Sequence, residues 1–310
     1  MVSTTSGRAG VLAAWSRYAS TNPRLRGTPV LGRSGTKMDV GLTMSISDTG
    51  PMEGWEAGTY GAVHAGVYDD WYGEGGRFPL AAAGTPAEVA DGVTTLVADA
   101  GGGPILELGV GTGRLALPLA ERGLDVTGLD DSPEMLDRLR AKPGADRLVL
   151  VEGDMADPST GTGLANGSFA VVLIGFNTLF CLTTAEAQAS CVAGVARLLA
   201  PGGHFAVEAF VPDPDSHEGI SVRAIEADAV VLDIARFDRD TQEIVGQRVE
   251  VGASGNRLFP YHLRYATPDQ MDAMATAAGL AARGRWADWS GGPFNENSTG
   301  HVSVWSRPGA

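Results

Sequence analysis

The sequence predicts an α/β protein with a parallel sheet, helices on both of its faces, and an antiparallel sheet inserted after the fifth strand. Two observations predict this fold. Between residues 104 and 211, short apolar runs alternate with segments that begin at helix-capping residues, as in successive strand–helix–strand units. After Pro212 the helices stop and strand-like runs follow one another across short polar turns, which favours antiparallel pairing.

The parallel part is preceded by a helix. Thr85-Pro86-Ala87-Glu88 has the pattern of a capping box with proline at the first helical position, and predicts a helix to about Asp99. The strands that follow are expected over 104–110, 125–130, 148–152, 169–176 and 204–211, and the helices over 112–122, 133–142 and from a cap at Thr183 to Leu199. The run over 169–176 is almost wholly apolar, as expected at the centre of a parallel sheet.

The inserted sheet is expected over about 213–266. Its strands are predicted over 222–224, 229–237, 243–251 and 259–265. A helix over 268–279 and final strands over 280–289 and 301–306 complete the predicted order.

Composition limits the class of protein. A chain of 310 residues fits one large domain with an insertion, and no apolar run reaches the length of a membrane span. The formal net charge of −14 argues against a nucleic-acid partner, because such binding needs Lys and Arg to neutralise phosphates. The two cysteines, Cys181 and Cys191, suggest no disulfide framework and favour a reducing cytoplasm.

The N-terminus differs from the rest of the chain. The first 50 residues contain six basic residues and only two acidic ones, Asp39 and Asp48. Such a start can be an organelle transit peptide, or an extension without an address upstream of a true start at Met44. We expect residues 1–45 to be a disordered extension and residues 46–310 to form the functional domain.

Three glycines at alternate positions follow the first predicted strand. In Ile105-Leu106-Glu107-Leu108-Gly109-Val110-Gly111-Thr112-Gly113 they give a bare backbone loop before a helix, where the anionic end of a nucleotide-like cofactor can bind. A dinucleotide fingerprint needs a small residue where Arg114 stands. A plain glycine-rich turn is the alternative interpretation.

Three acidic residues lie at the ends of successive strands, which meet at one edge of a parallel sheet: Glu107, Asp130 and Asp154. The carboxylate of Asp130 can accept both hydroxyls of a ribose, and that of Asp154 can accept from an adenine amine. Met155 can offer its backbone N–H and apolar surface to the same ring. Each acid alone could be a loop carboxylate or a helix cap, and Asp131 could cap the helix that opens at Pro133.

Residues 104–211 resemble the core of class I S-adenosylmethionine (SAM) methyltransferases. Ile105–Gly113 is similar to their glycine motif, Gly128–Ser132 to the ribose motif, Gly153–Met155 to the adenine motif, and Phe176-Asn177-Thr178 to the segment after strand four. The resemblance implies SAM as cofactor and a seven-stranded Rossmann-like sheet of order 3-2-1-4-5-7-6, with strand seven antiparallel. It also implies that Ser132 and Phe176 contact the cofactor, beside the loop glycines and the acids.

A narrower similarity concerns Tyr68-Asp69-Asp70-Trp71-Tyr72 and the inserted sheet. Both are similar to small-molecule N- and O-methyltransferases of natural-product pathways, including deoxyamino-sugar dimethyltransferases. This implies a helical lid over 54–100 that closes over SAM, with Tyr68 at the methionine part and Tyr72 at the entrance; the alternative is that these aromatics only pack the lid. Cys181 stands where some sugar enzymes carry a histidine implicated in catalysis, which puts a sugar amine in doubt.

The acceptor side is less defined. Methyl transfer needs a general base only if the acceptor arrives protonated, and Glu208 and His262 are the leading choices. A buried paired carboxylate and a cross-strand packing residue are the respective alternatives. Asn177, Phe176 and Phe180 should border the acceptor. The histidines and cysteines do not group at metal-ligand spacings, so we expect no metal.

The predicted function is therefore methyl transfer from SAM to a nitrogen or oxygen of a small-molecule acceptor, by in-line displacement. A protein substrate and a non-catalytic SAM-binding subunit are alternatives, and Arg114 disfavours a nicotinamide-dependent oxidoreductase. A nucleic-acid methyltransferase is disfavoured because Phe176-Asn177-Thr178-Leu179 replaces the tetrapeptide that grips a flipped base. A homodimer is one option for the oligomeric state.

Overall fold

A computed structural model describes residues 52–309, apart from 53, 57, 74, 79–83 and 254. Met52–Ala310 form one compact unit. The extension predicted over residues 1–45 lies outside the described residues.

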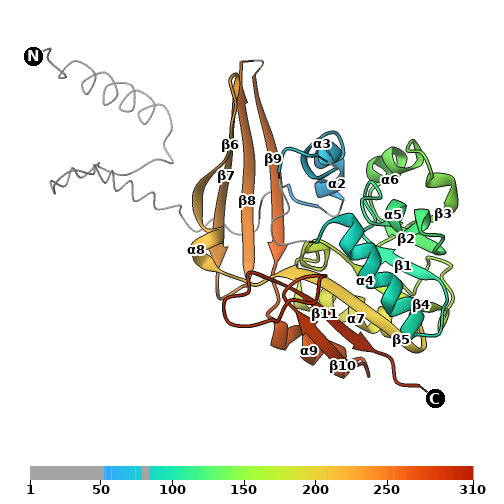
Figure 1. The fold of residues 1–310 in the computed structure, drawn as a ribbon. Coiled ribbons are helices and arrows are strands. Elements are labelled where there is room, and N and C mark those ends of the chain that lie inside the picture. Colours follow the sequence, from blue (N-terminus) through green and yellow to red (C-terminus); the bar gives the residue numbers. More distant parts are fainter. Residues whose placement is uncertain are drawn as a thin grey trace, which may run out of the picture. The chain divides into compact units, whose positions relative to one another are not determined.

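A seven-stranded sheet is the centre of this unit (Figure 1). Its order is β10-β11-β5-β4-β1-β2-β3, and only β11 runs antiparallel to both of its neighbours. The predicted order 3-2-1-4-5-7-6 is confirmed, with β11 as strand seven. The strands are β1 Ile105–Leu108, β2 Val126–Asp130, β3 Leu148–Glu152, β4 Phe169–Ile174, β5 Leu199–Phe210, β10 Ala281–Trp286 and β11 Gly300–Ser306.

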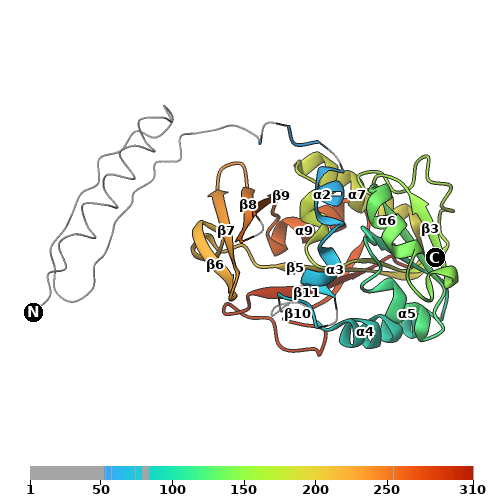
Figure 2. The ribbon, with the colours of Figure 1, turned by 90° about the horizontal axis from the view of Figure 1, so that it is seen from above.

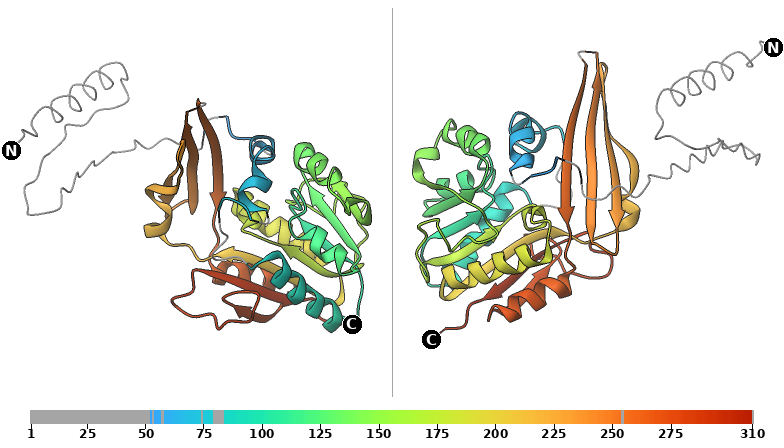
Figure 3. Two further views of the ribbon diagram at one scale, coloured as in Figure 1. Left: turned by 45° about the horizontal axis from the view of Figure 1, so that its top comes forward. Right: turned by 180° about the vertical axis from the view of Figure 1, so that it is seen from behind.

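Helices cover both faces of this sheet. Adjacent residues of a strand point to opposite faces, so Ile105 packs with helices α4, α5 and α6 while Leu106 packs with α7 and α9. In Figure 1 α4 lies in front of the sheet, and the view from behind in Figure 3 shows α7 and α9 on the other face. The helices are α4 Pro86–Asp99, α5 Ala116–Glu121, α6 Pro133–Arg140, α7 Ala185–Leu198 and α9 Pro268–Ala277.

The helix starts follow side-chain caps, with two changes from the prediction. Thr85 and Glu88 form the predicted capping box of α4. Helix α7 is capped by Thr184, whose hydroxyl accepts from the N–H of Ala187 at 3.1 Å, and not by Thr183. Helix α5 starts at Ala116 rather than at Thr112, because the glycine loop first turns through left-handed backbone.

Helix α6 is capped by Ser132 and not by Asp131. The hydroxyl of Ser132 accepts from the N–H of Met135 at 3.2 Å, so Ser132 caps the helix. The carboxylate of Asp131 is therefore not used as a helix cap, and it lies at the end of β2.

The inserted sheet follows β5, as predicted, and is wholly antiparallel. Its strands are β6 Gly219–Ile225, β7 Ala229–Asp238, β8 Glu243–Gly252 and β9 Gly255–Arg264, and α8 Pro214–His217 precedes it. The register shifts between Val222 and Ala224, so Arg223 forms a bulge in the edge strand β6.

Two short helices, α2 Thr59–His64 and α3 Tyr68–Tyr72, lie between the inserted sheet and α6 (Figures 1 and 2). Trp71, Tyr72 and Phe78 form an apolar cluster with Val231 and Phe259 of the insert. This cluster joins the N-terminal helices to the inserted sheet. None of the helices in the described ranges has both the length and the apolar character that a bilayer span requires.

Candidate functional site

A cavity of about 370 Å³, here called the rim cavity, opens where β1, β2 and β3 end. The sheet supplies one wall and the N-terminal helices supply another. The predicted cofactor residues that line it are Tyr68, Gly109, Gly111, Asp130, Asp131, Asp154 and Met155, beside Trp55, Tyr60, Gly61, Gly153, Thr178 and Cys181.

The glycine loop needs glycine at position 111 for its backbone conformation. Gly111 has a φ of 54°, in the left-handed region that side chains disfavour. A Cβ on Gly111 would meet no atom within 4 Å, so this position faces the open cavity. The loop therefore presents bare backbone to whatever occupies the rim cavity.

Asp130 holds the glycine loop and keeps further acceptor capacity at this edge. Its carboxylate accepts from the N–H of Gly111 at 2.7 Å and from the N–H of Ser132 at 3.0 Å, which holds the loop in place. Each oxygen keeps a second lone pair for a ligand hydroxyl. Burial raises the pKa of Asp130 to about 6, and these two hydrogen bonds oppose the shift.

The two other loop acids lie nearby. Burial and then the charge of Asp154 raise the pKa of Asp131. One carboxylate oxygen of Asp154 accepts from the N–H of Ala156 at 2.7 Å and so braces the turn after β3. Both acids and Met155 line the rim cavity.

Four residues predicted to contact the cofactor do not line the rim cavity: Glu107, Gly113, Ser132 and Phe176. Glu107 is buried behind the loop, and its Oε2 has no hydrogen-bond partner among the described residues. Burial raises its pKa to about 8, although the charge of Arg114 opposes the shift. Phe176 instead faces the second cavity, and its ring lies 5.1 Å from the guanidinium carbon of Arg114.

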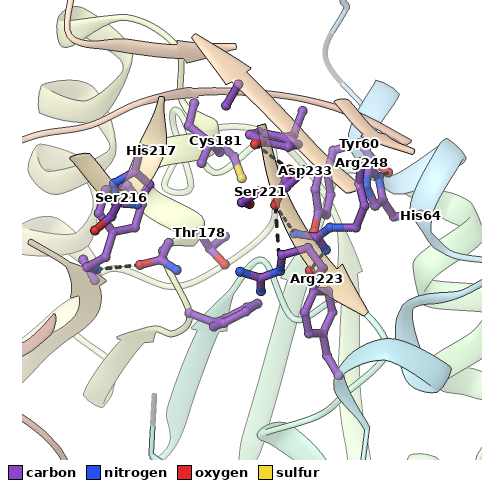
Figure 4. A pocket seen from close by; sticks show the side chains of 18 of the residues that line it. Tyr60, His64, Thr178, Cys181, Ser216, His217, Ser221, Arg223, Asp233 and Arg248 are labelled. Atoms are coloured by element: carbon purple, nitrogen blue, oxygen red, sulfur yellow. Dashed lines mark hydrogen bonds and ion pairs between the residues drawn. The ribbon is translucent and has the colours of Figure 1, made fainter. Parts of the chain in front are cut away.

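The second cavity, of about 580 Å³, lies between the sheet and the insert and is here called the insert cavity (Figure 4). Four predicted acceptor or catalytic residues line it: Tyr72, Phe176, Asn177 and Glu208. Its remaining polar wall comes from α8 and the inserted strands, and includes Asp215, His217, Glu218, Arg223, Asp233, Arg248 and Tyr261.

The two cavities share Tyr60, Tyr68, Thr178 and Cys181. Thr178 and Cys181 belong to the short 3-10 turn Thr178–Cys181 after β4. Phe176 and Asn177 precede this turn, and their φ values of 48° and 65° are unusual for residues with a side chain. Asn177 holds the turn, because its Oδ1 accepts from the N–H of Phe210 at 2.6 Å.

Glu208 lies at the floor of the insert cavity, almost fully buried. Its Oε2 accepts from the indole N–H of Trp289 at 3.0 Å. Burial raises the pKa of Glu208, while the Trp289 hydrogen bond and the charge of Arg114 lower it.

Two predicted acceptor-side residues lie elsewhere. His262 lines neither cavity: its neighbours Tyr261 and Leu263 face the insert cavity, so strand alternation turns His262 to the other face, where its Nε2 is 3.0 Å from Glu243. Phe180 is wholly buried in the core, with its ring 5.0 Å from that of Phe210. We correct both assignments, since neither side chain reaches the site.

Sequence reasoning missed the charged network of the insert. The carboxylate of Asp233 accepts from the Tyr261 hydroxyl at 2.8 Å and from Arg248 at 3.0 Å, and Arg248 also donates to the Tyr72 hydroxyl. The alternation of β7, β8 and β9 could have placed these side chains on one face, but only with the strand register known. The described residues contain no group of His, Cys, Asp or Glu that could hold a metal ion.

Comparisons with known proteins agree with this geometry. The family model of the methyltransferase domain matches residues 105–203. Cypemycin N-terminal methyltransferase from a Streptomyces species is 30% identical over 210 residues, covering 66% of this chain and 84% of that protein. The chain thus belongs to the SAM-dependent methyltransferases, and its cofactor is SAM.

Two solved structures are similar over most of the chain. The CcbJ methyltransferase from Streptomyces caelestis is 37% identical with a TM-score of 0.72, covering 83% of this chain and 100% of that one. SAM-bound CalS10, an amino pentose methyltransferase from Micromonospora echinaspora, is 25% identical with a TM-score of 0.55, over 83% of this chain and 100% of that one. Both are methyltransferases, and CalS10 is one involved in calicheamicin biosynthesis.

Proposed function

We propose that this enzyme transfers a methyl group from SAM in the rim cavity to a nitrogen or oxygen of a small molecule in the insert cavity. The observation that carries the proposal is the wall of four residues shared by the two cavities. Because these residues line both cavities, the cavities adjoin, and a donor in one would meet an acceptor in the other there.

The residues of the rim cavity fit SAM. Asp130 would accept from the ribose hydroxyls with its free lone pairs, and Asp131 lies beside it. Asp154 and Met155 would contact the adenine, and Tyr68 the methionine part. Glu107 would act from behind the loop, where its unpartnered Oε2 is an acceptor that a water or an amine could satisfy.

The acceptor would lie among Tyr72, Phe176 and Asn177. Bound SAM supplies a methyl group on a sulfonium sulfur, which an acceptor lone pair can displace in line. Glu208 would take the proton of an amine that arrives charged, since its raised pKa suits a base that works near neutral pH. Burial of Glu208 also keeps bulk water from competing for that proton.

An amine acceptor of small size is favoured over the alternatives. Two relatives are named for an N-terminus and an amino pentose, which supports nitrogen over oxygen. A cavity of about 580 Å³ has the usual volume for a small molecule. The shared wall supports a catalytic enzyme over a subunit that only binds SAM.

The proposal is tested by calorimetry and by product formation. SAM and S-adenosylhomocysteine (SAH) should bind, NAD should not, and amine acceptors should yield SAH. Asp130→Asn should weaken SAM binding about 10- to 100-fold, because asparagine has one acceptor oxygen where both N–H groups and the ribose need two.

The matched control is Asp137→Asn on the exposed side of α6, which should leave SAM affinity unchanged. Unchanged affinity in Asp130→Asn would mean that SAM binds elsewhere. SAM binding without SAH formation from any acceptor would favour the non-catalytic alternative.

A further inference from the structure

We propose that the acceptor carries a free carboxylate beside its amine, and that Arg223 binds this carboxylate; the inference rests on the proposed function of the insert cavity. The acceptor class is thus zwitterionic, like an amino acid. The argument depends on where Arg223 points, on which charges around it are already paired, and on the sign of the charge left over.

A β-bulge turns Arg223 toward the cavity. In β6, Val222 pairs with Leu232 and Ala224 pairs with Val231, so Arg223 is the extra residue between two consecutive pairs. Bulges often re-aim a side chain beside a functional site. Arg223 lines the insert cavity and lies near Arg248 in the close view of Figure 4.

Asp233 does not need Arg223 as a partner. Its two oxygens already accept from Tyr261 and Arg248, and the Nε of Arg223 only approaches Oδ2 at 4.0 Å. Arg223 also lies 5.8 Å from the ring of Phe78, and its side chain keeps 41% exposure. Apart from this long ion pair, no described residue hydrogen-bonds the guanidinium of Arg223, so its fork of N–H donors can bind a ligand.

Arg248, in contrast, is held by the protein. Only 11% of its side chain is exposed, its guanidinium bonds Asp233 and Tyr72, and it lies 5.2 Å from the ring of Trp71. Arg248 therefore fixes Asp233, and the ligand-binding charge is that of Arg223.

The charged residues that line the insert cavity favour a carboxylate over a phosphate as the ligand. Arg223 and Arg248 against Asp233 leave one positive charge, which matches one carboxylate, and an arginine fork binds a carboxylate through two parallel hydrogen bonds. The rest of the lining includes the acids Glu208, Asp215 and Glu218. These acids would repel a doubly charged phosphate, and they suit the cationic amine of a zwitterion.

The test uses matched pairs of amines that differ only in this charge. Proline and phenylalanine are each compared with their carboxamides, by binding to the SAH-loaded enzyme in ligand-observed NMR titrations. The wild type should bind the acids about 10- to 100-fold more tightly than the amides, the usual range for a charged hydrogen bond. Arg223→Gln should bring this ratio close to one.

Arg239→Gln is the matched control, because it removes one positive charge from an exposed turn of the same sheet, outside the cavity lining. It should keep the wild-type ratio. Acids that bind no better than amides, including no detectable binding of either, overturn the inference, and so does a ratio unchanged in Arg223→Gln.

SAH production by wild type with the same panel and SAM is measured separately. A clear binding preference without SAH formation would contradict methyl transfer to these amines and leave the carboxylate site standing. SAH formation from acids and amides alike would support methyl transfer and overturn the carboxylate site.

Discussion

Glu107 is a buried acid, and burial disfavours the charged form of its side chain. Because burial raises its pKa to about 8 from 4.5, the folded protein holds this proton more tightly than the unfolded chain does. The stability that Glu107 contributes is therefore full below about pH 4.5 and is lost as the pH rises toward 8. A group that costs stability at working pH is expected where a ligand needs the charge.

We predict that Glu107→Gln stabilises the ligand-free protein at alkaline pH, because the amide stays neutral at every pH. The gain in unfolding free energy should be on the order of a few kcal/mol at about pH 8.5 and small at about pH 5. Urea unfolding at both pH values measures it. Glu121→Gln, on an exposed helix residue, should show no such change with pH.

A Glu107→Gln variant less stable than wild type at high pH would contradict the assigned cost of the charge. The same variant should bind SAM more weakly if the Oε2 atom serves the cofactor. Those two effects are separable, since unfolding is measured without ligand.

Whether the sequence could place a side chain at the site depended on which structural feature sets the direction of that side chain. Asp130 and Asp154 were placed at the rim from sequence, because strand ends of a parallel sheet converge wherever the register falls, whereas Glu107, predicted with them, lies behind the loop. His262 was misplaced because a one-residue change of register moves a side chain to the other face. Phe180 was misplaced because the left-handed turn at Phe176 and Asn177 carries the chain back into the core.

Helices α2 and α3, which we propose form a lid, contribute residues to both cavities. Helices α2 and α3 have six and five residues and no side-chain N-cap, so they need tertiary contacts to persist. Asp69 supplies one, because it accepts from Lys142 at 2.7 Å and from the Thr112 hydroxyl at 2.6 Å. Gly61 supplies another: a Cβ there would overlap Ser132, so glycine lets α2 approach the rim.

We predict that SAH slows amide hydrogen exchange in residues 59–72 more than in the sheet. Short helices open at low free-energy cost, and a ligand held against Tyr60 and Tyr68 would raise that cost. Exchange measured by mass spectrometry with and without SAH checks this. Equal protection of α9, which lies away from the rim cavity, is the outcome that would contradict a lid.

The sequence predicted the helical segment and its aromatic motif, but not the contacts that hold α2 and α3 against the rest of the fold. Asp69 meets Lys142 across 73 residues, and no local pattern indicates a pairing of that range. The same limit applies to the caps: Thr183 and Thr184 are chemically equivalent, and only the hydrogen bond to Ala187 selects one of them. The edge strand β6 was placed but not its bulge, since a bulge is defined by the partner strand.

At the scale of the whole molecule, the cofactor and acceptor sites are built from segments far apart in the chain. The aromatic cluster of α3 packs on Val231 and Phe259 of the insert, while α2 contacts α6 of the parallel part. The insert therefore cannot lose its packing without exposing one wall of the site. We expect residues 52–309 to unfold as one cooperative unit.

This expectation gives the last prediction. SAH at about 100 times its dissociation constant should stabilise the folded state by about 2.7 kcal/mol and raise the unfolding temperature by about 5–10 °C. Because the rim cavity includes lid and sheet together, the whole transition should move, and calorimetric and van't Hoff enthalpies should agree. If scanning calorimetry shows a second transition that SAH leaves in place, the insert unfolds independently, and the shared wall between the cavities does not couple the two parts of the fold.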